Sequence, residues 1–332
     1  MAPLRWAIVG AGKISHDFVT AIQIFPDNHS VVAVGSGNRA NAEKFAEEHK
    51  IPKAYEGYEG IAKDKEVDVV YIGNLNTQHY ASTKLMLEHG KPVLCEKPFT
   101  MNEKQTTDLI ELARAKKVFL MEAVWSRCFP VYKKVRELID EGAIGEVMFA
   151  NVNFGFNLQN KERITNKNFG GGAILDLGIY ILQFQQFVFR GLKPIKVVVA
   201  GSLTKDGVDG TSAALISYEN GKLASVTCSA EIFLPNEGII IGTKGMMRLP
   251  RFWCPSELIT SNKTYNFDIP QSEVKFKYLY SGGLLYEADE VKQCLEEGKL
   301  ESPQITHCES IQLAQLMDLM RKEVGLRFKE DD

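Results

Sequence analysis

Lys97, Asp176 and Tyr180 are the residues of this chain whose types and spacing best suit proton and hydride transfer. Lys97 lies at the carboxyl end of a predicted parallel strand, and Asp176 and Tyr180 are four residues apart in a predicted helix, so they share one helix face. Lysine and tyrosine both have ordinary pKa values of about 10. A lysine partly desolvated beside a positively charged cofactor would have a lower pKa, and its ammonium would in turn favour tyrosinate. Such a pair could take the proton of an alcohol near neutral pH while a hydride leaves the same carbon.

Each of these residues also has an ordinary structural explanation. A lysine before a proline at a strand end is usually a surface residue. A tyrosine on an apolar helix is usually a core residue whose hydroxyl has a partner. Their joint occurrence, in this order and at these places, favours the chemical interpretation.

A glycine-rich turn near the start of the chain predicts dinucleotide binding. The first predicted strand ends in Gly10-Ala11-Gly12-Lys13-Ile14-Ser15, and a helical pattern begins at once. Gly10 allows a tight turn, and Gly12 lets a pyrophosphate approach the backbone at the helix N-terminus. Lys13 and Ile14, which follow in the turn, are further candidate cofactor contacts. Ser15 is small enough for close packing of helix on strand. The alternative is a turn of the same shape that holds no ligand.

The end of the second predicted strand favours NADP over NAD. Sites specific for NAD usually carry a carboxylate there, which binds the ribose hydroxyl. This chain has Val34-Gly35-Ser36-Gly37-Asn38-Arg39 instead. Ser36, Asn38 and Arg39 are donors suited to a 2′-phosphate, and arginine can bind it through two hydrogen bonds. The alternative is that Arg39 is merely a solvated residue in the first turn of a helix.

The first part of the chain alternates short apolar runs with helical patterns, which indicates a parallel, doubly wound sheet. The predicted strands are Trp6–Val9, Val31–Val34, Val67–Ile72, Pro92–Leu94 and Phe119–Met121. The predicted helices are Ser15–Ile24, Ala40–His49, Ala81–His89 and Glu103–Lys116. We therefore expect an N-terminal Rossmann domain over residues 1–124 that binds NADP.

The remainder, residues 125–332, is expected to form an α+β domain for substrate binding and dimerisation, with an open, mostly antiparallel sheet. Hairpin turns such as Asn220-Gly221 and Lys244-Gly245 separate its strand candidates. The predicted strands are Glu146–Phe156, Lys196–Leu203, Ala213–Tyr218, Leu223–Ile232, Gly238–Gly242, Met246–Leu249, Glu257–Thr260 and Tyr265–Ile269. The predicted helices are Val131–Glu141, Ala173–Phe189, Leu284–Glu297 and Thr306–Val324.

Two further motifs, together with the glycine-rich turn, resemble the Gfo/Idh/MocA family of oxidoreductases. One is Glu96-Lys97-Pro98, and the other is the helix start Gly170-Gly171-Gly172-Ala173-Ile174-Leu175-Asp176-Leu177-Gly178-Ile179-Tyr180. The resemblance runs along essentially the whole chain. The tyrosine at the end of the second motif, Trp125 and the chain length bring it nearest to members that oxidise trans-dihydrodiols or D-xylose with NADP. The family often has histidine where Tyr180 stands, so chemistry that relies on an imidazole is not expected.

The resemblance implies a role for each matching residue. Tyr180 would take or give the substrate proton, Lys97 would orient the hydroxyl and stabilise alkoxide charge, and Asp176 would position substrate and coenzyme. The loop after the third parallel strand would lie along the cofactor, although Asn74-Leu75-Asn76 replaces the family's T-P-N there. The implied cofactor contacts beyond the glycine-rich turn are Tyr71, Asn76, His79, Glu96 and Lys97. An ordinary loop histidine is the alternative for His79.

Three further side chains are candidates for the substrate site. Ile179, beside Tyr180, would help to shape the pocket. Trp125 and Phe154 would line the pocket or a subunit contact, with core packing as the alternative. Aromatic residues on an open sheet suggest that two sheets pair face to face, so we expect a homodimer.

The charge balance and the cysteine content indicate which partners and which compartment to expect. Lys and Arg total 39 and Asp and Glu total 42, giving a net charge of −3, so we expect neither nucleic acid nor membrane as a partner. No run of the sequence is apolar enough for a membrane helix, and the N-terminus is not typical of a signal peptide. The six dispersed cysteines predict reduced thiols and no metal site. We expect a cytoplasmic protein.

The sequence thus predicts an NADP-dependent oxidoreductase that acts on a cyclic diol or pyranose sugar. Two alternatives stay open. The same residues could reduce a sugar-derived ketone or lactone, or the chain could be a binding protein that senses NADP without turnover.

Overall fold

The computed structural model describes residues 2–332 and divides into two packing units. The first unit contains the chain up to Thr100, Lys104–Cys128 and Ile269–Ser310. The second contains Met101–Glu103, Phe129–Asp268 and Ile311–Asp332. This division differs from a single boundary after residue 124, because a late segment of the chain returns to the first unit. The assignment of functions to two sequence domains stays a prediction.

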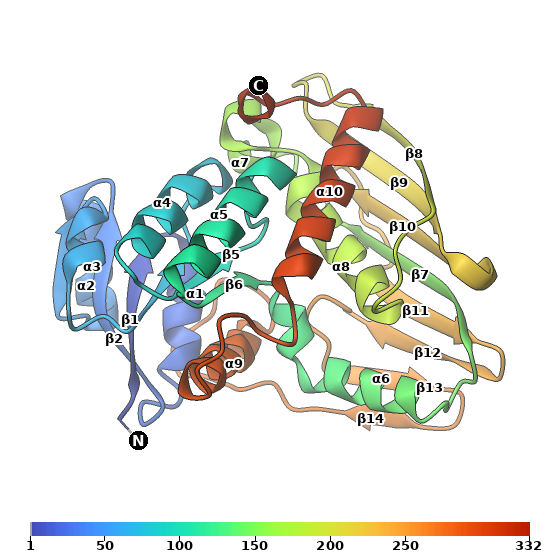
Figure 1. The fold of residues 1–332 in the computed structure, drawn as a ribbon, viewed down its shortest axis with the longest axis horizontal. Helices are drawn as coiled ribbons and strands as arrows, with labels where there is room; N and C mark the ends of the chain where they lie inside the picture. Colours follow the sequence, from blue (N-terminus) through green and yellow to red (C-terminus); the bar gives the residue numbers. More distant parts are fainter. Residues whose placement is uncertain (1) are drawn as a thin grey trace. The chain divides into compact units, whose positions relative to one another are not determined.

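A six-stranded parallel sheet forms the centre of the first unit, in the order β3-β2-β1-β4-β5-β6 (Figure 1). Three of the strands are four residues long and buried at every position, as in sheets covered on both faces. The strands are β1 (Leu4–Val9), β2 (His29–Ser36), β3 (Lys53–Glu56), β4 (Val69–Ile72), β5 (Val93–Glu96) and β6 (Leu120–Ala123). Strand β3 was not predicted, because its sequence Lys-Ala-Tyr-Glu has little apolar character.

Helices of the first unit alternate with these strands, as predicted, except that no helix was predicted over 59–63 and the helix near 284–297 was expected in the second domain. They are α1 (Lys13–Ile22), α2 (Arg39–His49), α3 (Glu59–Lys63), α4 (Asn76–Glu88), α5 (Glu103–Lys116) and, late in the chain, α9 (Leu284–Glu296). Two 3₁₀ turns, η1 (Trp125–Cys128) and η5 (Ser281–Gly283), complete the unit. The returning segment is fixed to α1 by Asp17, whose buried carboxylate accepts hydrogen bonds from Lys277 N, Tyr278 N and Ser281 Oγ.

The second unit contains an eight-stranded sheet in the order β14-β13-β12-β11-β7-β10-β9-β8. Its neighbours are antiparallel except β7 and β10, so the predicted open, mostly antiparallel sheet is confirmed. The strands are β7 (Val147–Gly155), β8 (Lys196–Leu203), β9 (Asp209–Ser217), β10 (Leu223–Ser229), β11 (Glu237–Gly242), β12 (Gly245–Pro250), β13 (Glu257–Thr260) and β14 (Thr264–Asn266). The β9–β10 hairpin turns at Asn220 and Gly221, both with positive φ.

One face of this sheet is covered by a helix that packs on β7 and β10 (Figure 1). The predicted helix over 173–189 is present, but it begins as a π-helical segment, η3 (Ile174–Gly178), before the α-helix α8 (Ile179–Val188). The other helices that lie wholly or partly in the unit are α6 (Pro130–Asp140), α7 (Glu162–Thr165) and α10 (His307–Glu323). Short 3₁₀ turns are η2 (Lys167–Phe169), η4 (Glu219–Gly221) and η6 (Lys329–Asp331).

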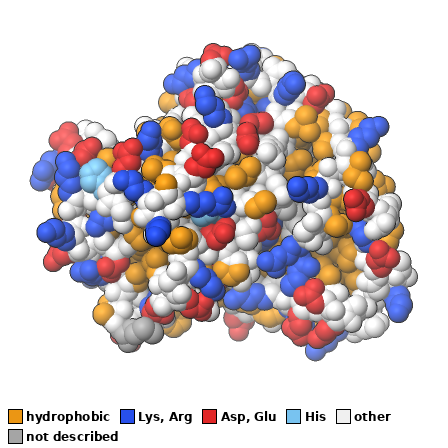
Figure 2. All heavy atoms as spheres, viewed as in Figure 1, with side chains coloured by type: hydrophobic (Ala, Val, Ile, Leu, Met, Phe, Trp, Pro, Cys, Tyr) orange, Lys and Arg blue, Asp and Glu red, His pale blue; other side chains and the backbone are white. Residues whose placement is uncertain are grey.

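Acidic and basic side chains are interspersed over the face drawn in Figure 2, so that face carries no extended field of one sign. Within residues 2–332, every helix is too short or too polar to cross a membrane.

Candidate active site

The glycine-rich turn after β1 has the geometry that its sequence predicts. Gly10 has φ +97°, and a Cβ at this position would lie 2.9 Å from the backbone of Asn74, so a side chain is excluded. Gly12 is exposed and forms the N-cap of α1 without a side-chain cap, and the first turn of α1 has no acidic residue. The free N–H groups and the positive end of the helix dipole therefore stay available for an anion.

Ser15 provides the close packing expected at the last position of the turn. Its side chain is fully buried in α1. A Cβ on Gly73, just after β4, would lie 2.6 Å from the Ser15 Oγ. The two small residues thus let the first turn of the helix approach the loop after the neighbouring strand.

The predicted 2′-phosphate residues lie at the end of β2 and the start of α2. Ser36 is half-buried, and Asn38 and Arg39 are exposed. Asn38 is the N-cap of α2, because its Oδ1 accepts a hydrogen bond of 3.2 Å from Asn41 N. Arg39 Nε donates to Glu43 Oε1 at 2.7 Å in an exposed pair. Exposed pairs of this kind contribute little, so the guanidinium can exchange Glu43 for a phosphate at small cost.

Lys97 follows β5, and buried polar groups hold the backbone on both sides of it. The carboxylate of Glu96 accepts the phenolic hydrogen of Tyr71 at 2.6 Å and the N–H of Lys97 at 3.2 Å. His79 Nδ1, on α4, donates to the carbonyl oxygen of Pro98 at 2.8 Å. Burial lowers the pKa of His79 and so favours its neutral ring.

Glu122 is the third buried side chain that holds this backbone segment, after Glu96 and His79. It was not among the residues expected in the site. It lies in β6, the neighbour of β5, and its Oε1 accepts the N–H of Phe99 at 3.1 Å. Burial raises the pKa of Glu122 to about 7. Its signal in the sequence was a carboxylate in Met121-Glu122-Ala123, at the carboxyl end of a predicted parallel strand. The half-buried Lys97 therefore lies in a backbone segment, residues 97–99, that side chains of β5, α4 and β6 hold in place.

The residues predicted along the cofactor differ in exposure: two are buried, and Asn76 is partly accessible to a ligand. Tyr71 and His79 are buried, with exposed fractions of 0% and 1%, so their side chains support Glu96 and Pro98 from within the unit. Asn76 is half-buried and is the first residue of α4. Trp125, a candidate for the substrate pocket or a subunit contact, is buried in η1.

In the second unit, the three-glycine motif is explained by its close neighbours. Gly172 has φ +119°, and a Cβ there would lie 2.1 Å from Asp209 Oδ1. A Cβ on Gly171 would lie 2.4 Å from the carbonyl oxygen of Ile164. The Asp209 carboxylate in turn accepts the N–H of Ile174 at 2.7 Å, and burial raises its pKa to about 6. The glycines therefore let a buried carboxyl cap the start of the helix that carries Asp176 and Tyr180.

Tyr180 lies in the first turn of α8 and packs edge-to-face on Phe154 of β7, with ring centroids 5.3 Å apart. Phe154 is 3% exposed and also contacts Phe252 and Trp253, so it lies on the helix-covered face of the sheet. A subunit contact through the opposite, open face cannot use its side chain. Ile179 is fully buried beside Tyr180.

Asp176 lies in the π-helical segment and forms an ion pair that the sequence analysis missed. Arg163 of α7 donates from its two terminal nitrogens to the two carboxylate oxygens, at 2.7 and 3.2 Å. The pairing is not visible in the sequence, because the two residues lie in different elements. π-Helical turns often occur at functional sites, and the bidentate arginine fixes the direction of the carboxylate.

The first unit thus has the parallel order and phosphate turn of a nicotinamide-binding Rossmann domain, with a rigidly held lysine at a strand end. Two family models match the chain: an oxidoreductase family with an NAD-binding Rossmann fold over residues 4–124, and the GFO/IDH/MocA C-terminal domain over residues 132–248. The chain belongs to the Gfo/Idh/MocA family of oxidoreductases, which confirms the predicted resemblance and fold class.

Curated relatives match the chain over almost its full length. It is 40% identical over 330 residues to the trans-1,2-dihydrobenzene-1,2-diol dehydrogenase of Danio rerio and 41% identical over 330 residues to that of Homo sapiens. Each alignment covers 99% of both chains.

Solved structures share the fold at lower identity. KijD10, a 3-ketoreductase from Actinomadura kijaniata solved with NADP and TDP-benzene, has a TM-score of 0.80 and 24% identity over 98% of both chains. The aldose-aldose oxidoreductase from Caulobacter crescentus, solved with glycerol, has a TM-score of 0.82 and 20% identity over 97% of this chain and 98% of its own.

Proposed function

We propose that this chain is an NADP-dependent dehydrogenase that oxidises a cyclic trans-diol or a pyranose sugar such as D-xylose. The observation that carries the proposal is the fixed Lys97 turn at the carboxyl end of β5, in the same parallel sheet as the phosphate turn after β1. Ligands of open parallel sheets bind at the carboxyl ends of the strands. The names of the curated relatives, dihydrodiol dehydrogenases, support a diol as substrate.

The proposed proton transfer uses Lys97 and Tyr180 on one substrate molecule. When bound, the nicotinamide supplies the hydride acceptor. Tyr180 takes the proton of the substrate hydroxyl as the carbon–hydrogen bond breaks, and returns it in the reverse direction. The Lys97 ammonium orients that hydroxyl and stabilises the alkoxide charge that develops. Asp176, held by Arg163, accepts a hydrogen bond from a second hydroxyl, which would favour diols and sugars over simple alcohols.

The proposed preference for NADP rests on the end of β2. Ser36, Asn38 and Arg39 offer hydrogen-bond donors there, and the segment Ser36–Arg39 lacks a carboxylate that could bind a ribose hydroxyl. The position of Arg39 as the first residue of α2 adds the helix dipole to its own positive charge. NADP in the KijD10 structure gives independent support from a protein of the same fold.

We also propose that the chain forms a homodimer through the open face of the second sheet. Strand register places the exposed apolar side chains of Leu223, Ile241 and Met246 in one cross-strand row. Leu215, 55% exposed, and its partner Val198, 52% exposed, lie on the same face in the neighbouring row. A contiguous apolar face of this kind favours burial against a second copy.

The proposed compartment is the cytoplasm. Within residues 2–332, the six cysteines form no disulfide, and five of them are buried. Dispersed cysteines outside disulfides are typical of reducing compartments.

Purified protein tests the catalytic proposal. With trans-benzene dihydrodiol or D-xylose and NADP⁺, absorbance at about 340 nm should rise, and the rate with NAD⁺ should be lower. A control without substrate should stay flat. If NADPH is consumed with sugar ketones or lactones but no diol or sugar is oxidised, the chain is a reductase. A flat trace in both directions, with NADP⁺ bound, would favour a sensor and overturn the proposal.

A further inference from the structure

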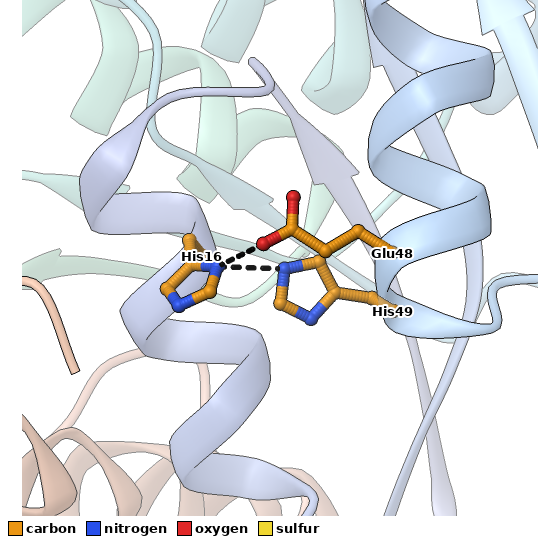
Figure 3. A group of neighbouring side chains, drawn as sticks. All are labelled: His16, Glu48 and His49. Carbon is orange, nitrogen blue, oxygen red and sulfur yellow. Dashed lines mark hydrogen bonds and ion pairs between the residues drawn. The ribbon is translucent and has the colours of Figure 1, made fainter. Parts of the chain in front are cut away.

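Two histidines and a glutamate from different helices of the first unit form a cluster that the proposed reaction does not use. His16 lies on α1, and Glu48 and His49 are the last two residues of α2. Figure 3 shows the His16 ring facing both the ring of His49 and the carboxylate of Glu48. His16 and His49 are 5% exposed, and the Glu48 side chain is 49% exposed, so solvent reaches the cluster from one side.

The spacing of the three side chains is that of a metal's ligand set. His16 Nδ1 lies 3.0 Å from His49 Nε2 and 3.2 Å from Glu48 Oε1. One ligand atom from each residue lies within 4.8 Å of the other two. Ligand atoms at about 2.0–2.1 Å from a tetrahedral zinc ion lie about 3.3 Å from one another. Small rotations of the side chains would therefore suffice to enclose an ion.

The hydrogen bond on the far side of His16 fixes its tautomer. His16 Nε2 lies 3.2 Å from the carbonyl oxygen of Lys275, which can only accept, so Nε2 carries the hydrogen. The Nδ1 lone pair then faces the cluster. Histidine ligands of metals commonly donate their other N–H to a backbone carbonyl in this way.

The remaining groups favour a cation at the centre. In that tautomer the His16 lone pair faces a carboxylate oxygen at 3.2 Å, and two acceptors at this distance repel unless a positive charge lies between them. His49 Nε2 donates the hydrogen bond of 3.0 Å to that lone pair, and a bound ion would take the place of this hydrogen. Lys277 is the nearby positive charge that opposes a cation.

We propose that His16, Glu48 and His49 bind a divalent transition-metal ion of the zinc class, with solvent as the fourth ligand. Two imidazoles and one carboxylate suit zinc, copper or nickel better than magnesium or calcium, which prefer oxygen ligands. The ion would join the end of α2 to the first turns of α1. Gln23 Nε2, just after α1, already donates to the carbonyl oxygen of His49 at 3.0 Å, so the two helices are held in register for it.

This site could not be predicted from the sequence, where His16 and His49 are separated by 33 positions and share no ligand spacing. The fold brings them together because α1 and α2 are neighbouring helices of one doubly wound unit. The ion would be structural, since the proposed proton transfer involves none of its ligands.

Metal binding to the tag-free full chain tests the proposal. After treatment with a chelator, equilibrium dialysis against Zn²⁺ should give one ion per chain, and Zn²⁺ should raise the Tm. Co²⁺ in the same site should show the intense visible absorption of a four-coordinate ion. Glu48→Gln and His49→Gln should each weaken binding by at least about 10- to 100-fold, because they remove a direct ligand.

Two variants serve as matched controls. Glu47→Gln changes the exposed neighbour of Glu48, and His89→Gln changes an exposed histidine at the end of α4; both should bind Zn²⁺ as the unmodified chain does. Glu48→Gln alters an exposed side chain, so it decides the question even if His49→Gln fails to fold. Absence of stoichiometric binding, or equal affinity in all four variants, would overturn the proposal and leave His16 and Glu48 as a proton-mediated pair.

Discussion

The Nδ1 of His79 lies 2.8 Å from the carbonyl oxygen of Pro98, the residue that follows Lys97. Glu96 and Glu122 hold the backbone N–H groups of Lys97 and Phe99 from two neighbouring strands. Three buried side chains therefore position the lysine through its neighbouring backbone. In the proposed reaction Lys97 contacts the substrate, whereas His79, Glu96 and Glu122 act only through Lys97.

His79→Ala should lower kcat with little change in NADPH affinity, because it releases the Pro98 carbonyl and lets Lys97 move. A displacement of about 1 Å can reduce a rate by about 100-fold. Steady-state kinetics and NADPH fluorescence titration measure the two effects separately. His89→Ala, at an exposed histidine, should leave both unchanged. An equal loss of kcat and of NADPH affinity in His79→Ala would instead indicate that the whole cofactor loop has collapsed.

Arg39→Ala should raise the KM for NADP⁺ by at least about 10-fold and leave the KM for NAD⁺ almost unchanged, because only NADP⁺ carries the 2′-phosphate. Glu43→Gln is the matched control. It removes the partner that Arg39 now holds at 2.7 Å, so NADP⁺ affinity should stay the same or improve. Equal effects of Arg39→Ala on both cofactors would contradict the proposed NADP site.

Glu122→Gln should change how stability depends on pH. Burial raises the pKa of Glu122 from 4.5 to about 7, so the unfolded chain loses this proton at lower pH than the folded chain. The carboxyl therefore reduces the free energy of unfolding as pH rises from about 4.5 to about 7, by about 2 to 3 kcal/mol in total. The glutamine side chain does not ionise, so it makes no pH-dependent contribution to the free energy of unfolding. Its amide oxygen can still accept the hydrogen bond from Phe99 N.

Chemical denaturation of both proteins at pH values of about 5 and 8 measures the difference. The unmodified protein should lose stability relative to Glu122→Gln at the higher pH. Parallel stability curves over this range would mean that Glu122 ionises at its ordinary pH in the folded chain.

Leu215→Glu should convert the proposed dimer to a monomer, because it places a charge in the centre of an apolar contact. Light scattering on the purified protein gives the mass directly. Leu300→Glu, at a leucine of the first unit that is 39% exposed, should leave the mass unchanged. If the unmodified chain is a monomer, or if Leu215→Glu remains a dimer, the open sheet face is not the interface.

Local patterns in the sequence were sufficient for the phosphate turn and for most of the elements, but they missed β3, α3 and α7. Gly10 and Gly12 act through their own backbone, and the longer helices and most strands follow from hydrophobic periodicity. The contacts that hold the site were not visible, because each joins distant positions. Asp209 packs against Gly172 and accepts a hydrogen bond from Ile174 N, and Arg163 pairs with Asp176. Glu122 reaches Phe99 N only because β5 and β6 pair in the sheet. The π-helical start of the Asp176 helix leaves no mark in the apolar periodicity, so periodicity alone predicted an ordinary helix.

The central claim is that Lys97 and Tyr180 act together on one substrate hydroxyl, and a double-mutant cycle tests it most directly. Lys97→Met and Tyr180→Phe should each lower kcat for diol oxidation by at least about 100-fold while NADPH binding is retained. Residues that act as a unit are strongly non-additive. The double variant should therefore be hardly slower than the slower single variant. If the two losses multiply, or if either single variant keeps near-normal turnover, the two residues do not share one transition state.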